Sequence, residues 1–376
     1  MDNRSPQVRP YRVIIAGGGT GGHVFPAIAI GRAIKEKHPD ARILFTGAKG
    51  RMEMEKVPEA GFHIIGLNIS GLQRRLTWKN LLVPFRLIDS LSRARNIVKR
   101  FKPDVVIGVG GYASAPLVRA AHRQRIPTLI QEQNSYPGLT NRMLGRKADR
   151  ICVAYTGMEK WFAKEKIYLT GNPVRQDLLE AEKPEKKSEA LAYFGLSAGK
   201  PLILAMGGSL GALSVNQGVM NGLEAFRLNK IQLIWQTGRS FYETALKNVE
   251  ALGGNSEIKV YPFITRMDLA YALADVVVSR AGAIAISEIS ALKKPSLLIP
   301  SPYVAEDHQT RNAKALVNQQ AAQMLTEQEA PEKLAGEAIA LINDEERMQR
   351  MKEKLAGLSF RKASEAIASM ALGLIH

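Results

Sequence analysis

The chain has 376 residues, which is long enough for two or three domains of ordinary size. Its 45% hydrophobic and 23% charged residues are typical of a globular protein and exclude a disordered or collagen-like chain. Its apolar runs are too short to span a membrane, and the run 13–16 is too short for the core of a signal peptide. The single cysteine, Cys152, excludes an internal disulfide. We therefore expect a soluble, cytoplasmic protein.

The net charge of +17 is concentrated in the first half of the chain. Residues 1–175 contain 30 lysines and arginines against 12 acidic residues, whereas residues 176–376 contain 22 against 23. This asymmetry predicts an anionic partner for the first half, which would be a nucleic acid, an anionic membrane or a phosphorylated ligand. A basic surface that serves only solubility is the alternative.

Short apolar runs predict the strands of two sheets. In chain order they are 12–16, 42–46, 105–109, 128–131 and 150–153, then 202–206, 232–236, 257–262, 276–279 and 296–299. Helical patterns separate most of them, and strands that alternate with helices indicate parallel sheets covered on both faces. We predict an α/β protein with two tandem Rossmann-like domains, 1–175 and 176–359, and a C-terminal helix at about 360–376 that packs back on the first domain.

Glycine-rich loops follow strands in both halves. Residues 17–22 (GGGTGG) satisfy the GxGxxG pattern and open a helix, and residues 108–112 (GVGGY) and 207–212 (GGSLGA) follow later strands. Backbone amides at such a helix start favour an anionic ligand. A dinucleotide fold would also need a carboxylate after the second strand, and residues 46–49 provide none. The loops predict a cleft between the domains in which each domain holds one substrate; glycines that serve only tight turns are the alternative.

Seven segments carry a resemblance to a known family. In chain order they are GGTGGHVFP (18–26), GGYAS (110–114), QEQN (131–134), GNPVR (171–175), GGSLGA (207–212), SRAGAIAISE (279–288) and EDHQTRNA (306–313). Together they closely resemble the MurG family, the peptidoglycan N-acetylglucosaminyltransferases. The resemblance implies the glycosyltransferase-B fold and an inverting transfer of N-acetylglucosamine from UDP-N-acetylglucosamine to the muramoyl 4-hydroxyl of lipid I, which yields lipid II.

Two other classes of protein compete with this interpretation. A related nucleotide-sugar enzyme of the same fold, such as a transferase to another lipid acceptor or a UDP-N-acetylglucosamine epimerase, would share the donor half. A nucleic-acid-binding protein would explain the charge, but aromatic residues make up only 6% of the chain and alternate with basic residues in one segment only. We therefore expect no nucleic-acid partner.

An inverting sugar transfer needs a base for the acceptor hydroxyl and compensation for the charge of the departing diphosphate. His23, inside the first glycine loop, is the leading candidate for the base and Glu132 is its rival; a histidine that only orients the loop is the alternative. No Asp-x-Asp motif occurs in the chain. The glycine-loop amides, Ser209 and Arg175 are therefore expected to stabilise the diphosphate without a metal or any other cofactor.

The donor pocket is predicted in the second half. Glu288 lies on a helix after the strand 276–279 and could accept both ribose hydroxyls, unless it is only a solvated helix residue. The resemblance adds further donor contacts, which are Thr20, Gly21, Gly22, Asn134, Phe263, Ile264, Met267, Ala283, Ile284, Ala285, Ile286, Ser287 and Gln309. It places Gly18 and Tyr112 at the acceptor, although an ordinary packed tyrosine is an equal alternative. The chain departs from the family at Gln131, where a histidine is common.

Segment 71–102 contains nine lysines and arginines and one acidic residue, Asp89. Apolar and basic side chains interleave in its first half, which suits peripheral insertion at an anionic membrane surface; a solvated basic face is the alternative. The predicted membrane residues are Leu72, Arg74, Arg75, Leu76, Trp78, Lys79, Leu82 and Phe85. We expect a peripheral protein on the cytoplasmic face of the inner membrane. Its expected partners are UDP-N-acetylglucosamine, lipid I and the anionic membrane surface, with cell-wall synthesis proteins as further candidates.

Overall fold

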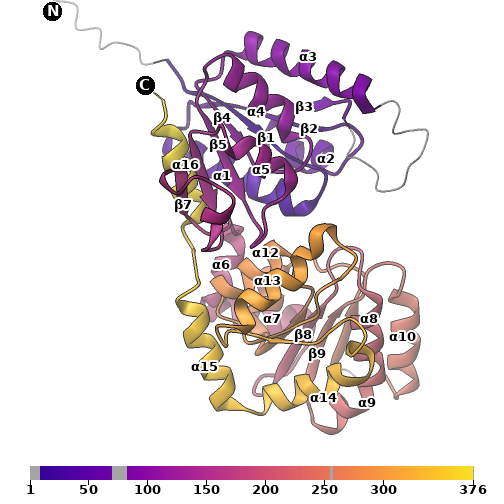
Figure 1. The fold of residues 1–376 in the computed structure, drawn as a ribbon. Coiled ribbons are helices and arrows are strands. Elements are labelled where there is room, and N and C mark those ends of the chain that lie inside the picture. Colours follow the sequence, from indigo (N-terminus) through magenta and orange to yellow (C-terminus); the bar gives the residue numbers. More distant parts are fainter. Residues whose placement is uncertain (1–8, 70–82, 255–256, 376) are drawn as a thin grey trace, which may run out of the picture. The chain divides into compact units, whose positions relative to one another are not determined.

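The computed structural model of the chain describes residues 9–69, 83–254 and 257–375. The chain folds into two compact units, both drawn in Figure 1. Unit 1 consists of Met1–Pro173 and Lys362–His376, and unit 2 consists of Val174–Arg361. Each unit is built around one fully parallel sheet, which confirms the prediction of two tandem Rossmann-like domains.

Unit 1 contains a seven-stranded sheet in the order β3-β2-β1-β4-β5-β6-β7. Its strands are β1 (Arg12–Ala16), β2 (Arg42–Ala48), β3 (His63–Leu67), β4 (Val105–Gly108), β5 (Thr128–Glu132), β6 (Arg150–Val153) and β7 (Ile167–Leu169). In the middle of the sheet, Ile14 of β1 lies opposite Leu44 of β2 and Val106 of β4. Residues 13–16 are fully buried because a parallel strand covered on both faces is apolar along its length.

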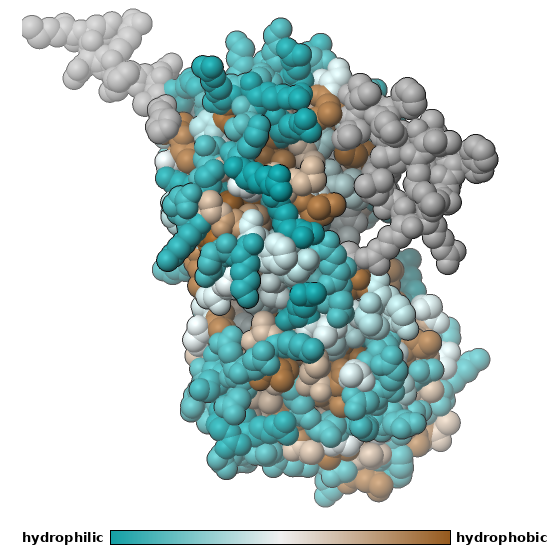
Figure 2. Space-filling view, in the orientation of Figure 1, coloured by the Kyte–Doolittle hydropathy of each residue, from teal (hydrophilic) through white to brown (hydrophobic). Residues whose placement is uncertain are grey.

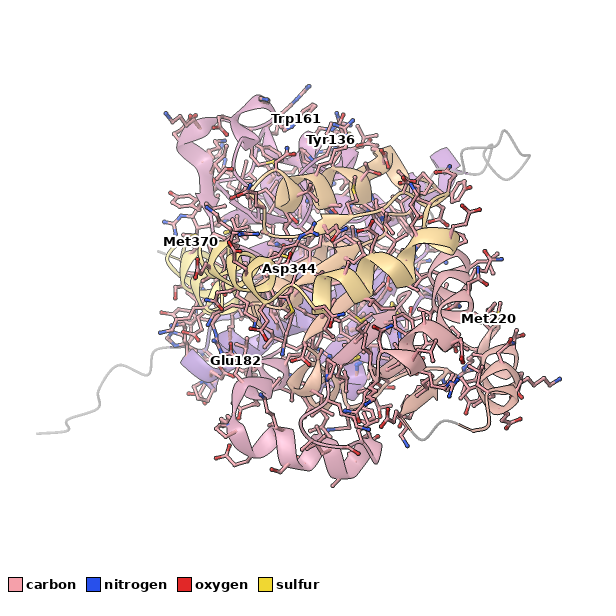
Figure 3. The ribbon with its side chains drawn as sticks, turned by 90° about the horizontal axis from the view of Figure 1, so that it is seen from below. Tyr136, Trp161, Glu182, Met220, Asp344 and Met370 are labelled. Atoms are coloured by element: carbon pink, nitrogen blue, oxygen red, sulfur yellow. The ribbon has the colours of Figure 1, made fainter. Side chains whose placement is uncertain are left out.

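Helices cover both faces of the unit 1 sheet. They are α1 (Gly21–Lys37), α2 (Glu53–Glu59), α3 (Val83–Phe101), α4 (Ser114–Arg123), α5 (Leu139–Gly145) and α16 (Ala363–Leu372). Side chains of α1, α2 and α16 share one core, and those of α3 and α4 share the core on the opposite face. Arg150 Nη1 of β6 donates a hydrogen bond of 2.7 Å to the carbonyl oxygen of Met370, which Figure 3 labels on α16. This contact ties the C-terminal helix to the sheet of unit 1.

Unit 2 contains a six-stranded sheet in the order β10-β9-β8-β11-β12-β13. Its strands are β8 (Leu202–Met206), β9 (Gln232–Gln236), β10 (Ile258–Tyr261), β11 (Val276–Ser279), β12 (Ser296–Leu298) and β13 (Gln323–Met324). Its helices are α6 (Gln176–Leu179), α7 (Pro184–Phe194), α8 (Leu213–Asn221), α9 (Leu223–Leu228), α10 (Tyr242–Ala251), α11 (Met267–Leu273), α12 (Ala283–Ala291), α13 (His308–Val317), α14 (Ala330–Ile342) and α15 (Glu345–Ala356). Trp235 and Phe226 are fully buried in its core.

All the predicted strands occur, with ends within two residues of the expected ones, but three strands were missed. The missed strands are β3, β7 and β13, and each lies at the edge of a sheet. Residues of an edge strand keep one side in contact with water, so they lack the continuous apolar run that marks a central strand. In β3, for example, His63 and Ile65 are exposed.

The visible surface of both units is mostly hydrophilic (Figure 2). Large exposed apolar side chains, such as Leu228 and Tyr303, also occur on unit 2, as is usual for globular proteins. Within the part of the chain that the structure describes, no helix combines the length and the apolarity that crossing a bilayer would require.

Candidate active site

The first glycine loop joins β1 to α1 at the carboxyl edge of the unit 1 sheet. Gly18 and Gly19 have φ angles of 152° and 94°, which side chains with a Cβ rarely adopt. The buried carboxylate of Glu53, in α2, accepts hydrogen bonds from the N–H of Gly19, at 3.0 and 3.1 Å to its two oxygens, and from the N–H of Ala48 at 2.9 Å. The N–H of Gly19, in the loop predicted to bind an anionic ligand, therefore already donates to a carboxylate of the protein itself.

Glu53 is a residue that the sequence analysis missed, because it lies on a helix and not directly after the second strand. A Cβ atom on Gly18 would lie 2.1 Å from Glu53 Oε1, and one on Gly47 would lie 2.5 Å from Glu53 Cγ. These two glycines are thus needed so that the carboxylate can approach the backbone closely. Residues 46–49 themselves provide no carboxylate, and the carboxylate that meets this loop comes from α2.

His23 lies in the first turn of α1, and its half-buried imidazole packs against the third glycine loop. Gly110 and Gly111 have φ angles of 91° and 74°, and a Cβ atom on either would lie 3.0 Å from the imidazole ring. Nδ1 of His23 is 3.2 Å from Oε1 of Gln133, which follows β5. The structure therefore gathers two glycine loops and the end of β5 around the predicted base.

Glu132, the rival base, ends β5 and is only 2% exposed. Its Oε1 accepts hydrogen bonds from the backbone N–H (2.9 Å) and from Nδ2 (3.2 Å) of Asn134. Its Oε2 accepts from the N–H of Gly138 (3.1 Å) and from Nδ2 of Asn141 (2.9 Å). The pKa of Glu132 is raised, because the effect of burial outweighs that of these hydrogen bonds, which lower it. With both oxygens engaged, the carboxylate organises the turn that carries Asn134.

An aromatic pair packs on the same turn. The rings of Tyr136 and Trp161 meet edge to face with their centroids 4.8 Å apart, and Figure 3 shows them side by side. The guanidinium of Arg142 lies 5.3 Å and 5.2 Å from the two ring centroids. The aromatic pair and Arg142 stabilise this turn together with the hydrogen bonds to Glu132, and these contacts fix the position of the Asn134 backbone.

The predicted acceptor residues also lie at this edge of unit 1. Gly18 is buried, whereas Thr20 is exposed and precedes the first turn of α1, which begins with Gly21 and Gly22. The ring of Tyr112 lies 3.3 Å from where a Cβ atom on Gly19 would be. Its hydroxyl oxygen is buried and has no hydrogen-bond partner among the described residues. A buried hydroxyl in this state is what a site for a polar ligand would contain.

The glycine loop of unit 2, residues 207–212, joins β8 to α8. Gly211 has a φ angle of 80°, and a Cβ atom on it would lie 2.0 Å from the carbonyl oxygen of Thr237, so glycine is required there. Ser209 is exposed on the loop. Neither α8 nor α12 has an acidic residue in its first turn. The positive ends of these two helices therefore suit an anionic ligand, in contrast to the loop of unit 1 that Glu53 occupies.

Glu288 lies on α12 with its side chain 12% exposed. Its Oε2 accepts a hydrogen bond of 3.2 Å from the hydroxyl of the buried Tyr271, and its Oε1 lies 3.8 Å from Nε of Arg175. Burial raises the pKa of Glu288 to about 7, although the charge of Arg175 and the Tyr271 hydroxyl both lower it. The structure thus brings two predicted donor residues together and adds Tyr271, which the sequence analysis did not predict.

Some predicted donor groups already have partners within unit 2. The N–H of Ile264 donates to Oε1 of Gln236 (2.8 Å), and Oε1 of Gln309 accepts from the N–H of Ser301 (2.9 Å). A ligand would therefore contact these residues through the carbonyl oxygen of Ile264 and through Nε2 of Gln309. Phe263 is 52% exposed, and the half-buried Met267 begins α11.

The predicted residues at the start of α12 differ in what their side chains contact. Ala283 and Ile286 are buried in unit 2, whereas Ile284, Ala285 and Ser287 are half-buried. Ser287 Oγ donates a hydrogen bond of 2.8 Å to the carbonyl oxygen of Ala283. Ala283 and Ile286 could therefore reach a ligand only through the backbone of the helix start.

The predicted membrane residues 72–82 lie outside the described residues, and Phe85 belongs to the first turn of α3. Among the residues that the structure describes, no group of three or more histidine, cysteine, aspartate or glutamate side chains is arranged to hold a metal ion.

Comparisons with known proteins match both units. Residues 13–153 match the glycosyltransferase family 28 N-terminal domain and residues 202–367 match the family 28 C-terminal domain. A UDP-N-acetylglucosamine--N-acetylmuramyl-(pentapeptide) pyrophosphoryl-undecaprenol N-acetylglucosamine transferase of Parabacteroides distasonis is 50% identical and covers 98% of this chain and 99% of its own. The crystal structure of Acinetobacter baumannii MurG has a TM-score of 0.76 at 27% identity, over 97% of this chain and 100% of that one. A UDP-GlcNAc 2-epimerase of Neisseria meningitidis, bound to UDP-GlcNAc, shares the fold at a TM-score of 0.69 and 16% identity, over 97% of this chain and 100% of that one.

Proposed function

The chain belongs to glycosyltransferase family 28, and from this premise we propose that it transfers N-acetylglucosamine from UDP-N-acetylglucosamine to the muramoyl 4-hydroxyl of lipid I, which forms lipid II for peptidoglycan. The observation that carries the proposal is a relative of that named activity that is 50% identical over 368 residues, and thus over both units. The likeness to the epimerase extends to the fold alone.

The reaction forms one bond and breaks one bond at the anomeric carbon of the donor sugar. The acceptor 4-hydroxyl oxygen attacks this carbon while the bond to the β-phosphate oxygen of UDP breaks, so the configuration inverts through an oxocarbenium-like transition state. The proton of the hydroxyl passes to a base of the enzyme, and the electron pair of the broken bond leaves with UDP. The protein must therefore supply a proton acceptor and must stabilise a growing negative charge.

His23 is the proposed base. An imidazole changes its charge near neutral pH, and in this chain it is half-buried in the first turn of α1, against Gly110 and Gly111 of the third glycine loop. The four hydrogen bonds on Glu132 argue against that residue, because taking a proton there would break contacts that hold its turn. Glu132 is instead proposed to position Asn134 at the transferring sugar.

The departing diphosphate is proposed to bind the starts of α8 and α12 together with Ser209 and Arg175. No acidic side chain lies in the first turn of either helix, so the backbone amides there can meet the phosphates without an internal carboxylate. Arg175 would add its guanidinium, which also lies near the carboxylate of Glu288. We expect this charge compensation to make the transfer independent of a divalent metal.

The test is incubation with a lipid I analogue and either UDP-N-acetylglucosamine or UDP-glucose, with and without EDTA. We expect transfer of N-acetylglucosamine alone, at an unchanged rate in the chelator, with detection of the product by mass spectrometry. Release of 2-epimerised donor without any transferred sugar would contradict the proposed function and would favour the epimerase. Loss of activity in EDTA that Mg²⁺ restores would contradict metal independence only.

Donor binding is expected to weaken as the pH falls through about 7. The ribose hydroxyls donate to the charged form of Glu288, and the pKa of this group is raised to about 7, so the binding form is populated above that pH and is lost below it. If only the carboxylate binds, the Kd of UDP-N-acetylglucosamine rises about 10-fold between pH 8 and pH 6. Isothermal titration calorimetry measures this change. Glu288→Gln should bind weakly at both values, and a wild-type Kd that is constant with pH would refute the ribose contact.

The basic segment 71–102 is proposed to hold the enzyme at the cytoplasmic face of the inner membrane, where a lipid-linked acceptor is found. Each basic residue near an anionic surface contributes about 1 kcal/mol, so several support reversible peripheral binding. We expect binding to vesicles that contain anionic lipid, with loss at high salt. Trp78→Asp combined with Leu82→Asp should weaken it about 10-fold in a sedimentation assay. Leu228→Asp, at an exposed site of unit 2, is the control. Equal binding by the double variant and the control would refute the proposal.

A further inference from the structure

Three buried amide side chains form a hydrogen-bonded chain that ends on His23. They are Gln131, Gln133 and Asn172, which are 0%, 1% and 3% exposed. Asn172 Oδ1 accepts from Gln131 Nε2 (2.8 Å), Gln131 Oε1 accepts from Gln133 Nε2, and Gln133 Oε1 lies 3.2 Å from Nδ1 of His23. The imidazole that the proposed function uses as a base is thus connected to the interior of unit 1 by amides.

A backbone carbonyl determines which way the Gln133 amide points. Nε2 of Gln133 donates a hydrogen bond of 2.7 Å to the carbonyl oxygen of Val109, and a carbonyl oxygen can only accept. The amide oxygen of Gln133 therefore faces His23. Turning the amide around would bring its oxygen against two acceptors, Val109 O and Gln131 Oε1, which burial makes costly.

A second carbonyl gives the same direction independently. Nδ2 of Asn172 donates a hydrogen bond of 2.9 Å to the backbone carbonyl oxygen of Gln133, so Oδ1 of Asn172 faces Gln131. Gln131 must then donate through Nε2 toward Asn172 and accept through Oε1 from Gln133. The carbonyl oxygens of Val109 and Gln133 thus each require that the amide oxygen of Gln133 faces Nδ1 of His23. An amide oxygen can only accept, so Nδ1 carries the hydrogen.

We propose that Gln133 is a positioning residue that holds neutral His23 as the Nδ1–H tautomer, so that Nε2 is the nitrogen that takes the proton of the acceptor hydroxyl. The role of Nε2 as the proton acceptor rests on the proposed function, whereas the Nδ1–H tautomer does not. The group that meets Nδ1 is the neutral amide of Gln133. The two buried carboxylates of this part of unit 1 accept from other groups: Glu132 from Asn134, Gly138 and Asn141, and Glu53 from Gly19 and Ala48. Gly110 and Gly111 leave the room in which the ring lies against the loop.

Histidine tautomers are read directly from ring nitrogen shifts. Protein labelled with ¹⁵N-histidine is examined in long-range ¹H–¹⁵N spectra at about pH 8, where an imidazole of ordinary pKa is neutral. The His23 signals are identified by their loss in His23→Gln. We expect a protonated Nδ1 and an unprotonated Nε2 in the wild-type protein. A protonated Nε2, or an equal mixture of the two forms, would overturn the proposal without involving any variant or any activity.

The variant Gln133→Met keeps the length of the side chain and removes its oxygen. We expect its His23 to become a mixture of tautomers and its kcat to fall about 10–100-fold, with the KM for UDP-N-acetylglucosamine within about twofold of wild type. Gln124→Met, which removes an exposed amide bonded to Ala120 O in the same unit, should change neither. Unchanged tautomer populations in a folded Gln133→Met protein would also overturn the proposal. A wild-type protein with the expected tautomer that transfers no sugar would instead refute the proposed function.

Discussion

Replacing His23 by alanine is expected to lower kcat by a factor of about 10²–10⁴ while the Kd for UDP-N-acetylglucosamine stays within about twofold of wild type. The variant loses the proposed proton acceptor, whereas the donor contacts expected at Glu288, Arg175 and the starts of α8 and α12 belong to unit 2. Single-turnover kinetics with a lipid I analogue measure the chemical step, and calorimetry measures donor binding.

His63→Ala is the matched control for this experiment. His63 lies on the edge strand β3 of the same unit and is exposed, so its removal should leave both turnover and donor affinity unchanged. A His23→Ala protein that turns over at a rate close to wild type would exclude the imidazole from proton transfer. In that case Glu132 would be the remaining candidate, and Glu132→Gln, which keeps an acceptor oxygen for the turn, would be the variant to examine.

Replacing Glu53 by alanine is expected to lower the free energy of unfolding by about 3 kcal/mol or more. The carboxylate is 1% exposed and accepts the N–H groups of Gly19 and Ala48, so the variant leaves two donors without their acceptor and opens a cavity beneath the first glycine loop. Turnover should fall as well, because the loop leads directly into the turn of α1 that carries His23. Chemical denaturation followed by circular dichroism measures the stability change.

Two further variants separate the role of this carboxylate from a general effect of α2. Glu53→Gln keeps one amide oxygen, which can accept from both N–H groups, so it should cost much less than alanine. Glu55→Ala removes an exposed glutamate from the same helix and should change the free energy of unfolding by about 0.5 kcal/mol or less. Equal unfolding midpoints for Glu53→Ala and Glu55→Ala would show that the glycine loop does not depend on Glu53.

Most of the fold could be predicted because its central strands are buried on both faces. β1, β4 and β8 contain continuous apolar runs, and such runs are visible in the sequence without any knowledge of their neighbours. The glycine loops could be placed for a similar reason, since each follows its strand directly. Edge strands such as β3 and β7 escaped prediction because exposure on one side removes the apolar run.

The sites could be predicted only as a set of residue types. His23, Glu132, Arg175 and Glu288 were recognised from motifs, and the structure brings His23 beside the third glycine loop and Arg175 beside Glu288. Several polar residues that contact them were not recognised, namely Gln133 at His23, Asn141 at Glu132 and Tyr271 at Glu288. Glu53 was missed because nothing in its surrounding sequence marks it as an acceptor for the backbone of a loop 34 residues earlier.

The two parallel sheets, the glycine loops at their carboxyl edges, the excess of positive charge in the first half and the family can all be read from the order of residues along the chain. The partners of the polar atoms are known only from the folded chain. There Glu53 accepts from the N–H of Gly19, both oxygens of Glu132 accept hydrogen bonds, and a glutamine oxygen faces His23. Apolar periodicity and glycine motifs act over neighbouring residues, whereas the contact between His23 and Gln133 joins positions 110 residues apart. Hydrogen-bond direction in a buried network depends on all its members at once, and it appears only when the chain has brought them together.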